Sequence, residues 1–155
     1  MSDLTHLTAD GSAQMVDISD KAVSQRMATA RGLIQLTPKT LERLYRGDLP
    51  KGEALSVARI AAIQAAKRTS DLVPLCHPLM IQQVRVAFER REEGVELIAT
   101  VRCQGKTGVE MEALCAVSVG LLTLYDMVKA VEPSATITQI ELLEKRGGKT
   151  DLTRT

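Results

Sequence analysis

The segment from Glu110 to about Val131 is predicted to form a helix whose apolar side chains lie nearly all round it. Leucine, valine and methionine fall on every side of the helical wheel, and Pro133 ends the segment. Such a helix has to be buried on more than one side. Because a chain of 155 residues supports one domain with one core, we expect a neighbouring subunit to cover part of this helix.

The composition argues against several classes of protein. A net charge of +1 argues against bulk nucleic-acid binding, which needs a basic excess. Asp126 and Lys129, with two hydroxyl residues, make the long helix too polar for an unaided membrane span. Three cysteines without a short Cys pair predict reduced thiols. The first 15 residues have no apolar run, so we expect no signal peptide and a cytoplasmic location.

Hydrophobic periodicity predicts the order strand, two helices, strand, strand, helix, strand. The strands are expected at 27–36, 84–89, 95–103 and 136–144, and the helices at 37–47, about 51–68 and 110–131. This order matches an α+β, ferredoxin-like split βαβ fold with an antiparallel sheet and an extra helix in the first crossover. A single domain is expected over 1–155, with a flexible N-terminal segment at 1–14 and a polar C-terminal tail at 147–155.

Asp126 and Lys129 are the charged residues that stand out in the long helix. They are three residues apart and therefore share a helix face. An ion pair on an exposed stripe would explain them without any function. The apolar residues around them instead suggest partial burial, which can lower the pKa of a lysine and make it an acid or base near neutrality. The residues alone leave both interpretations open.

Glu110, Glu112 and His77 have structural explanations as well as functional ones. Acidic residues in the first turn of a helix are favoured by the helix dipole. Two residues apart, the carboxylates point in different directions, so we do not expect a carboxylate dyad. His77 lies in a loop between Pro74 and Pro78, where it can donate a hydrogen bond or carry a proton. No metal-ligand spacing is present, so no metal site is predicted.

Basic residues recur in two contexts that could bind an anion. Lys51, Arg59, Lys67 and Arg68 lie along one region, either as a solvated helix face or as a cluster that contacts phosphate. Two Gly-Lys-Thr triplets begin at Gly105 and Gly148, but both lack the earlier glycine of a phosphate-binding P-loop. The first triplet precedes a helix N-terminus, which favours anions. A plain turn remains the simpler interpretation of each triplet.

Together, in this order, these segments resemble the cyclic pyranopterin monophosphate synthase family of molybdenum cofactor biosynthesis. The resemblance covers about residues 15 to 149 and rests on long, unusual blocks. They are Met15-Val16-Asp17-Ile18-Ser19, Lys51-Gly52, Ala58-Arg59-Ile60-Ala61, Ile63-Gln64-Ala65-Ala66-Lys67-Arg68-Thr69, Asp71-Leu72-Val73-Pro74-Leu75-Cys76-His77-Pro78-Leu79, Gly105-Lys106-Thr107-Gly108-Val109-Glu110-Met111-Glu112-Ala113 and Leu124-Tyr125-Asp126-Met127-Val128-Lys129-Ala130-Val131.

The resemblance implies a lyase that converts 3',8-cyclo-7,8-dihydroguanosine 5'-triphosphate, the product of a radical S-adenosylmethionine enzyme, to cyclic pyranopterin monophosphate and pyrophosphate. It implies a homohexamer, a trimer of dimers, with active sites at dimer interfaces. It places catalytic roles on Asp126, Lys129 and Lys51. Substrate contacts fall on Leu75, Cys76, His77, Met111 and Glu112, with Lys67, Arg59 and Glu110 as further pocket residues. No cofactor is required by the sequence, although a magnesium ion bound through the triphosphate is compatible with it.

A mechanism follows as a hypothesis. Asp126 would orient Lys129 and tune its protonation. Lys51, from the partner subunit or across the cleft, would be the second acid or base. His77 and Glu112 would hold the guanine-derived ring.

Two other functions remain open from the sequence. A non-catalytic nucleotide-binding module could use the same fold. An RNA-binding domain of this fold would stack bases on aromatic residues of its sheet. Tyr45 and Tyr125 fall on predicted helices, which leaves only Phe88 on a strand and disfavours RNA.

Overall fold

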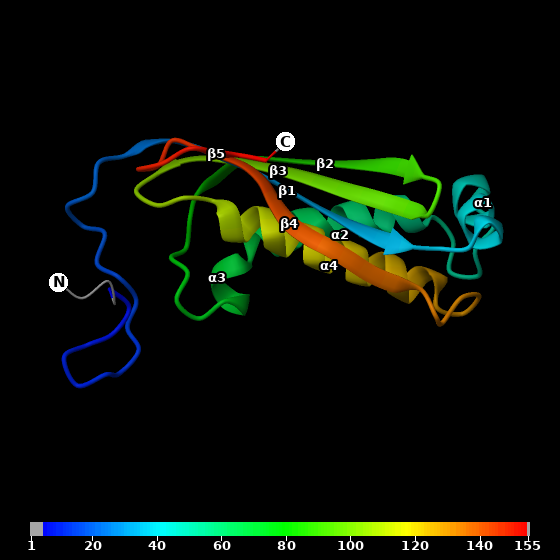
Figure 1. Cartoon of the computed structure of the whole chain (residues 1–155), viewed down its shortest axis with the longest axis horizontal. Helices are drawn as coiled ribbons and strands as arrows, with labels where there is room; N and C mark the ends of the chain where they lie inside the picture. Colours follow the sequence, from blue (N-terminus) through cyan, green and yellow to red (C-terminus); the bar gives the residue numbers. More distant parts are fainter. Residues whose placement is uncertain (1–4, 155) are drawn as a thin grey trace.

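The computed structural model describes residues 5–154, and within them one antiparallel sheet is covered on one face by helices (Figure 1). The strand order is β2-β3-β1-β4-β5. The two long helices, α2 and α4, lie side by side under the sheet, and α1 sits at one end of it. The elements are β1 (Ser24–Gln35), α1 (Pro38–Arg46), α2 (Ala54–Lys67), α3 (Thr69–Leu72), β2 (Ile81–Arg91), β3 (Gly94–Gly105), α4 (Glu110–Val128), β4 (Thr136–Arg146) and β5 (Leu152–Thr153).

The ferredoxin-like prediction is confirmed, with α1 as the extra helix in the first crossover. Two small elements were not predicted. The four-residue α3 follows α2 directly, and the two-residue β5 pairs with β4 inside the polar tail. The long helix ends at Val128, three residues earlier than the sequence indicated, and a turn leads from there to Pro133.

Local sequence signals explain where α1 begins and ends. Thr37 is its N-cap, with a side-chain oxygen that accepts a hydrogen bond from the backbone N–H of Thr40, and Pro38 occupies the first turn. Gly47 ends the helix with a φ of 73°, a left-handed conformation that glycine adopts without steric cost. This short helix is therefore defined at both ends by its own residues.

The core is built from small and aliphatic side chains, because the chain has few aromatic ones. Buried alanines of α2 face α4 and allow the two helices to approach closely. A Cβ added at Gly120 of α4 would lie 3.1 Å from the Cβ of Ala62 and 2.5 Å from Cδ1 of Leu97. Gly120 is therefore part of the close contact between α2, α4 and the sheet.

The length and composition of α4 alone would permit it to cross a membrane. In this fold it packs against α2 and against β1, β3 and β4, as the central helix of a protein core does. In the part of the chain that the structure describes, no other helix meets those criteria.

The N-terminal segment runs along the end of the molecule that is remote from α1 (Figure 1). A bridge between Leu7 and Ala13 closes a small turn in it. The flexibility predicted for residues 1–14 stays a prediction, and residues 1–4 lie outside the described part.

Replacing Gly120 by valine is expected to destabilise the fold by about 1–3 kcal/mol, because the new side chain overpacks the contact between α2 and Leu97. Thermal or urea unfolding followed by circular dichroism measures this. The control is Gly105→Ala, whose Cβ would meet its nearest neighbour, the Cys103 sulfur, at an ordinary 3.6 Å. Equal stability of the Gly120→Val variant and the parent would contradict close packing at this point.

Candidate active site

Lys51, Asp126 and Lys129 form one cluster, here called the lysine–aspartate cluster, beside the C-terminal end of α4. The Lys51 ammonium lies 2.7 Å from one carboxylate oxygen of Asp126, and the Lys129 ammonium lies 2.9 Å from the other. Asp126 is in the last turn of α4 and Lys129 is its C-cap, whereas Lys51 comes from the loop between α1 and α2. Because one chain supplies both lysines, the alternative that Lys51 reaches Asp126 from a partner subunit is not needed.

The two lysines stabilise the ionised form of the aspartate. The hydrogen bond from Lys51, followed by that from Lys129, lowers the pKa of Asp126 to about 2. The same pairing raises the pKa of Lys129, chiefly through its hydrogen bond to Asp126. In the chain alone, the pairing with Asp126 thus outweighs any lowering of the Lys129 pKa by burial, and a role of Lys129 as an acid or base stays a prediction. The physical reason is exposure, since the side chains of Asp126 and Lys129 are 51% and 49% exposed.

A second group of predicted residues lines a cavity of about 260 Å³ at the opposite, N-terminal end of α4. We call it the α4 N-terminal cavity. The substrate contacts implied by the resemblance meet there, together with residues of the N-terminal segment. The lining includes Leu75, Cys76, His77, Glu110, Met111 and Glu112, with Thr5, His6, Val16, Ile18, Lys21, Leu79, Thr107 and Gly108.

The polar groups of this cavity differ in their burial, their hydrogen bonds and their pKa values. Glu112 is only 4% exposed, and its burial, with a smaller effect of Glu110, raises the pKa of its carboxyl group. The Nε2 atom of His77 lies 2.8 Å from the carbonyl oxygen of Val16. Because a carbonyl only accepts, Nε2 carries a proton and Nδ1 faces its other neighbours. Burial raises the pKa of the Cys76 thiol, which favours the neutral form over a nucleophilic thiolate.

Glu110 differs from Glu112 because it is paired. Its carboxylate lies 3.2 Å from the Lys145 ammonium of β4 and turns back over Gly108, where a Cβ would be 2.0 Å from it. The two carboxylates thus border the same cavity, but Glu110 is paired with a lysine. This agrees with the prediction that helical spacing keeps them from forming a dyad.

A larger basic cavity of about 590 Å³ adjoins the first and shares Lys21, Thr107, Gly108 and Glu110 with it. Its cations come from the N-terminal segment, from β1, from both Gly-Lys-Thr triplets and from the end of β4. They are Lys21, Arg26, Lys106, Lys145, Arg146 and Lys149. Such a set of cations beside a helix N-terminus suits a ligand with several phosphates.

Sequence reasoning missed most of this basic cavity. Arg26 and Lys145 lie on strands, where no local motif marks them. The two Gly-Lys-Thr triplets were the sequence signal that could have indicated this cavity. Lys106 and Lys149 are more than forty residues apart in the sequence, but β1 pairs with both β3 and β4 and brings the two triplets to one place.

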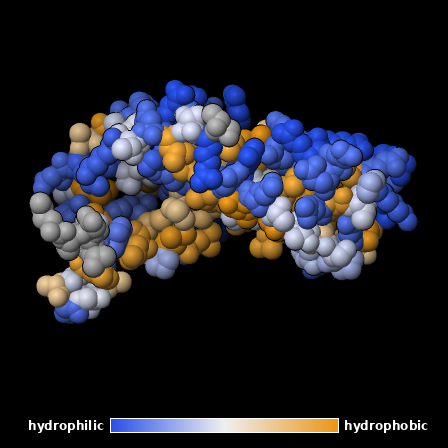
Figure 2. All heavy atoms as spheres, viewed as in Figure 1, coloured by the Kyte–Doolittle hydropathy of each residue, from blue (hydrophilic) through white to orange (hydrophobic). Residues whose placement is uncertain are grey.

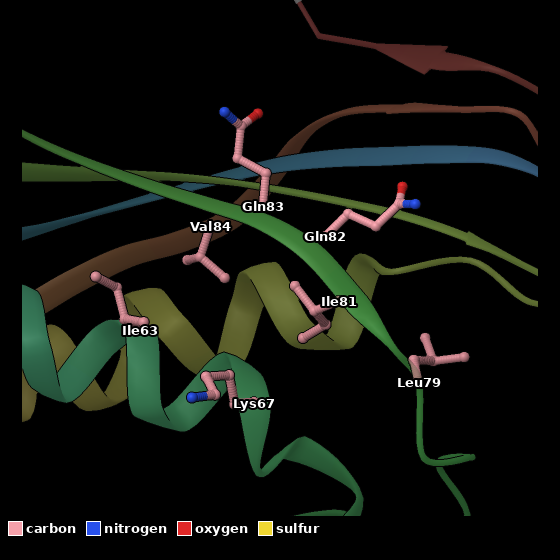
Figure 3. A pocket seen from close by; sticks show the side chains of 7 residues that line it. All are labelled: Ile63, Lys67, Leu79, Ile81, Gln82, Gln83 and Val84. Carbon is pink, nitrogen blue, oxygen red and sulfur yellow. The ribbon is translucent and has the colours of Figure 1, made fainter.

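Lys67 and Arg59 lie apart from both cavities and from the lysine–aspartate cluster. Figure 3 shows Lys67 and Ile63 of α2 opposite Ile81 and Val84 of β2, lining a separate cavity of about 290 Å³. The Arg59 guanidinium stacks over the ring of Phe88 at 5.3 Å. Their roles in substrate binding stay predictions. Among residues 5–154, no three His, Cys, Asp or Glu side chains lie together as metal ligands.

The two groups of predicted site residues do not meet within one chain. Glu112 and Asp126 are both in α4, and their separation of fourteen positions corresponds to about 21 Å along a helix. The cavity that contains Glu112 includes no residue of the lysine–aspartate cluster. One chain therefore presents two candidate half-sites at opposite ends of the same helix.

Replacing Lys51 by methionine is expected to raise the pKa of Asp126 more than replacing Lys129 by methionine, because the Lys51 hydrogen bond is the larger cause of the lowering. The lowered pKa means that the charged cluster stabilises the fold above the ordinary pKa of an aspartate and loses that effect as the pH falls towards 2. Carbon-13 NMR titration of the Asp126 carboxyl group measures the shift. An unchanged titration in both variants would contradict the cluster.

Comparison with known proteins places the chain in one family. The family model described as the MoaC family matches residues 15–148. A protein named cyclic pyranopterin monophosphate synthase from Chloroflexus aurantiacus is 54% identical over 149 residues, which cover 95% of this chain and 91% of the relative. Relatives of the same name from Novosphingobium aromaticivorans and Methylobacterium sp. are 53% and 55% identical, each over 96% of this chain and over 95% and 94% of the relative. This chain therefore belongs to the MoaC family.

Proposed function

We propose that this protein converts 3',8-cyclo-7,8-dihydroguanosine 5'-triphosphate to cyclic pyranopterin monophosphate and releases pyrophosphate in molybdenum cofactor biosynthesis. Relatives more than half identical over nearly their whole length carry the name of this synthase. The observation that carries the proposal is the pair of joined cavities. A buried carboxyl group lies in one and a set of cations in the other, as a substrate with a guanine-derived ring and a triphosphate requires.

The ring belongs in the α4 N-terminal cavity. The Glu112 carboxyl group can accept hydrogen bonds from the N–H groups of the ring, and its burial strengthens such bonds. His77 is fixed through Nε2 and leaves Nδ1 to face the ligand. The triphosphate belongs in the basic cavity, where lysines and arginines offset its charge while pyrophosphate leaves.

Proton transfer belongs to the lysine–aspartate cluster. Asp126 holds two lysines with their ammonium groups on its two oxygens, so both are oriented from one point. In the chain alone the pairing keeps Lys129 protonated, which suits a proton donor. Burial against the substrate would lower the pKa of Lys129 and allow the same nitrogen to accept a proton.

A second subunit would join the two half-sites. The chain leaves large apolar residues exposed on its helices and in the loop before β2, and Figure 2 shows hydrophobic residues gathered on the helical side of the molecule. They include Val57, Ile60, Leu72, Met80 and Leu122. A two-fold interface over this face would bring the cluster of one subunit to the cavity of its partner. The assembly we propose is a homohexamer, a trimer of such dimers.

The enzyme that must act before this one follows from the chemistry of the proposed substrate. A cyclised dihydro-GTP has to come from a cyclase acting on GTP, for which we propose a radical S-adenosylmethionine enzyme. We propose a cytoplasmic location and no nucleic-acid or membrane partner. Any magnesium would arrive bound to the triphosphate, because the described residues offer no ligand set of their own.

Replacing Asp126 by asparagine is expected to lower kcat/KM by about 100-fold or more, because both lysines lose the charge that orients them. The assay incubates purified protein with the cyclised dihydro-GTP and measures pyrophosphate and cyclic pyranopterin. The matched control is Glu92→Gln, an exposed acid-to-amide change in the hairpin turn. Tight binding of the intermediate without product from the parent would contradict the reaction and indicate a binding module.

Mixing two inactive variants tests the shared site. Asp126→Asn disables one half-site and Glu112→Gln the other. In a mixed dimer one site retains both intact halves, so random mixing is expected to restore about a quarter of the parent activity. Co-refolding followed by the product assay measures this, with native mass spectrometry to establish mixed oligomers. Mixed oligomers without recovered activity would contradict a site built from two subunits.

A further inference from the structure

We propose that Glu132 is a positioning residue that holds Lys51 against Asp126 by fixing the start of α1. The relevance to catalysis rests on the function proposed above, whereas the structural part stands on contacts within the chain. Glu132 lies outside both cavities, and among the described residues it forms no hydrogen bond or ion pair with Lys51, Asp126 or Lys129.

The side chain of Glu132 is nearly buried and, within residues 5–154, hydrogen-bonds to Thr37 alone. It is 9% exposed and accepts three hydrogen bonds from Thr37. The backbone N–H of Thr37 lies 3.0 and 3.1 Å from the two carboxylate oxygens, and the hydroxyl group lies 2.9 Å from one of them. The charge is also favourable at the N-terminus of α1. These bonds fix both the distance and the direction of Thr37 relative to Glu132.

The segment from Thr37 to Asp48 is held by hydrogen bonds along its length. It contains the N-cap, the two and a half turns of α1 and the left-handed cap at Gly47. Beyond the cap, the Arg43 side chain donates hydrogen bonds to the carboxylate of Asp48 at 3.1 Å and to its carbonyl oxygen at 2.8 Å. A change in the direction of α1 at Thr37 is therefore carried to its far end, where the loop with Lys51 begins.

Glu132 lies on the same stretch of backbone as Asp126 and Lys129 of the lysine–aspartate cluster, and we call this stretch the frame. Asp126, Lys129 and Glu132 follow one another at intervals of three, and the backbone N–H of Glu132 donates to the carbonyl of Val128 at 2.9 Å. The frame thus contacts the segment from Thr37 to Lys51 at two points, at Thr37 through Glu132 and at Lys51 through Asp126.

The second of these contacts is weak by itself. The Lys51 and Asp126 side chains are 39% and 51% exposed, and an exposed ion pair contributes little to holding its partners together. Leu41, Leu44 and Leu49 keep α1 on the core, but apolar contacts are non-directional and do not fix its angle. The contact of Glu132 with Thr37 supplies that direction.

The test compares Glu132→Ala with Glu132→Gln, whose amide oxygen can still accept a bond from Thr37. The stability control is Val101→Ala, a core change toward the opposite end of β3. In Glu132→Ala we expect the Asp126 carboxyl group to titrate at a higher pH in carbon-13 NMR, because Lys51 moves away. We expect kcat to fall about 10- to 100-fold with little change in KM. The Glu132→Gln variant should stay within a few-fold of the parent.

A double-mutant cycle adds a readout that a merely structural role would not move. In a Lys51→Ala background, Glu132→Ala should cause no further loss of kcat. The proposal is overturned if the Asp126 titration is unchanged in Glu132→Ala, or if Val101→Ala shifts it equally. If Glu132→Ala does not fold, Thr37→Val has to shift the Asp126 titration in the same direction, because it removes the hydroxyl donor to Glu132 together with the side-chain acceptor for the Thr40 N–H and keeps the backbone donor. A shifted titration in a protein that never turns over the dihydro-GTP supports the positioning role and overturns only the proposed reaction.

Discussion

The packing of α4 against α2 and the sheet is the interaction on which the rest of the molecule depends. Gly120 and the alanines of α2 let the helices approach, and the apolar residues of α4 fill the space below β1, β3 and β4. The same helix carries a candidate site residue near each end. Because it is continuous over its 19 residues, its length fixes the separation of Glu112 from Asp126 along the helix.

The two half-sites differ in the way they are built. Glu112 is buried, and its burial raises the pKa of its carboxyl group. Asp126 is exposed and holds two lysines, so its pKa is lowered. When two carboxyl groups of one active site have pKa values shifted in opposite directions, they can take different roles. The group with the raised pKa favours hydrogen bonding to a ring, while the group with the lowered pKa stays ionised. We infer that an interface combines them, and that closure of the interface also removes water from the cluster.

The sequence could predict the fold because its local signals agree with one another. Thr37, Pro38 and Gly47 mark α1, and alternation marks β2 and β3. It also placed Lys51 and Asp126 among the candidates, through the resemblance and the polar interruption of α4. It could not predict the α4 boundary, because the turn after Val128 continues the helical pattern. It left open whether Lys129 is buried or exposed, since exposure is decided by tertiary packing. The sequence could not predict the basic cavity, because strand pairing brings Arg26 and Lys145 together from separate segments.

A crystal structure of the Lys51→Ala variant with bound cyclised dihydro-GTP would show whether two subunits share one site. We expect the guanine-derived ring against Glu112 of one subunit, the phosphates among the cations of the basic cavity, and Asp126 and Lys129 of a partner subunit in contact with the same ligand. A ligand bound in the cavity with the lysine–aspartate clusters of all subunits facing solvent would contradict a site shared between two chains.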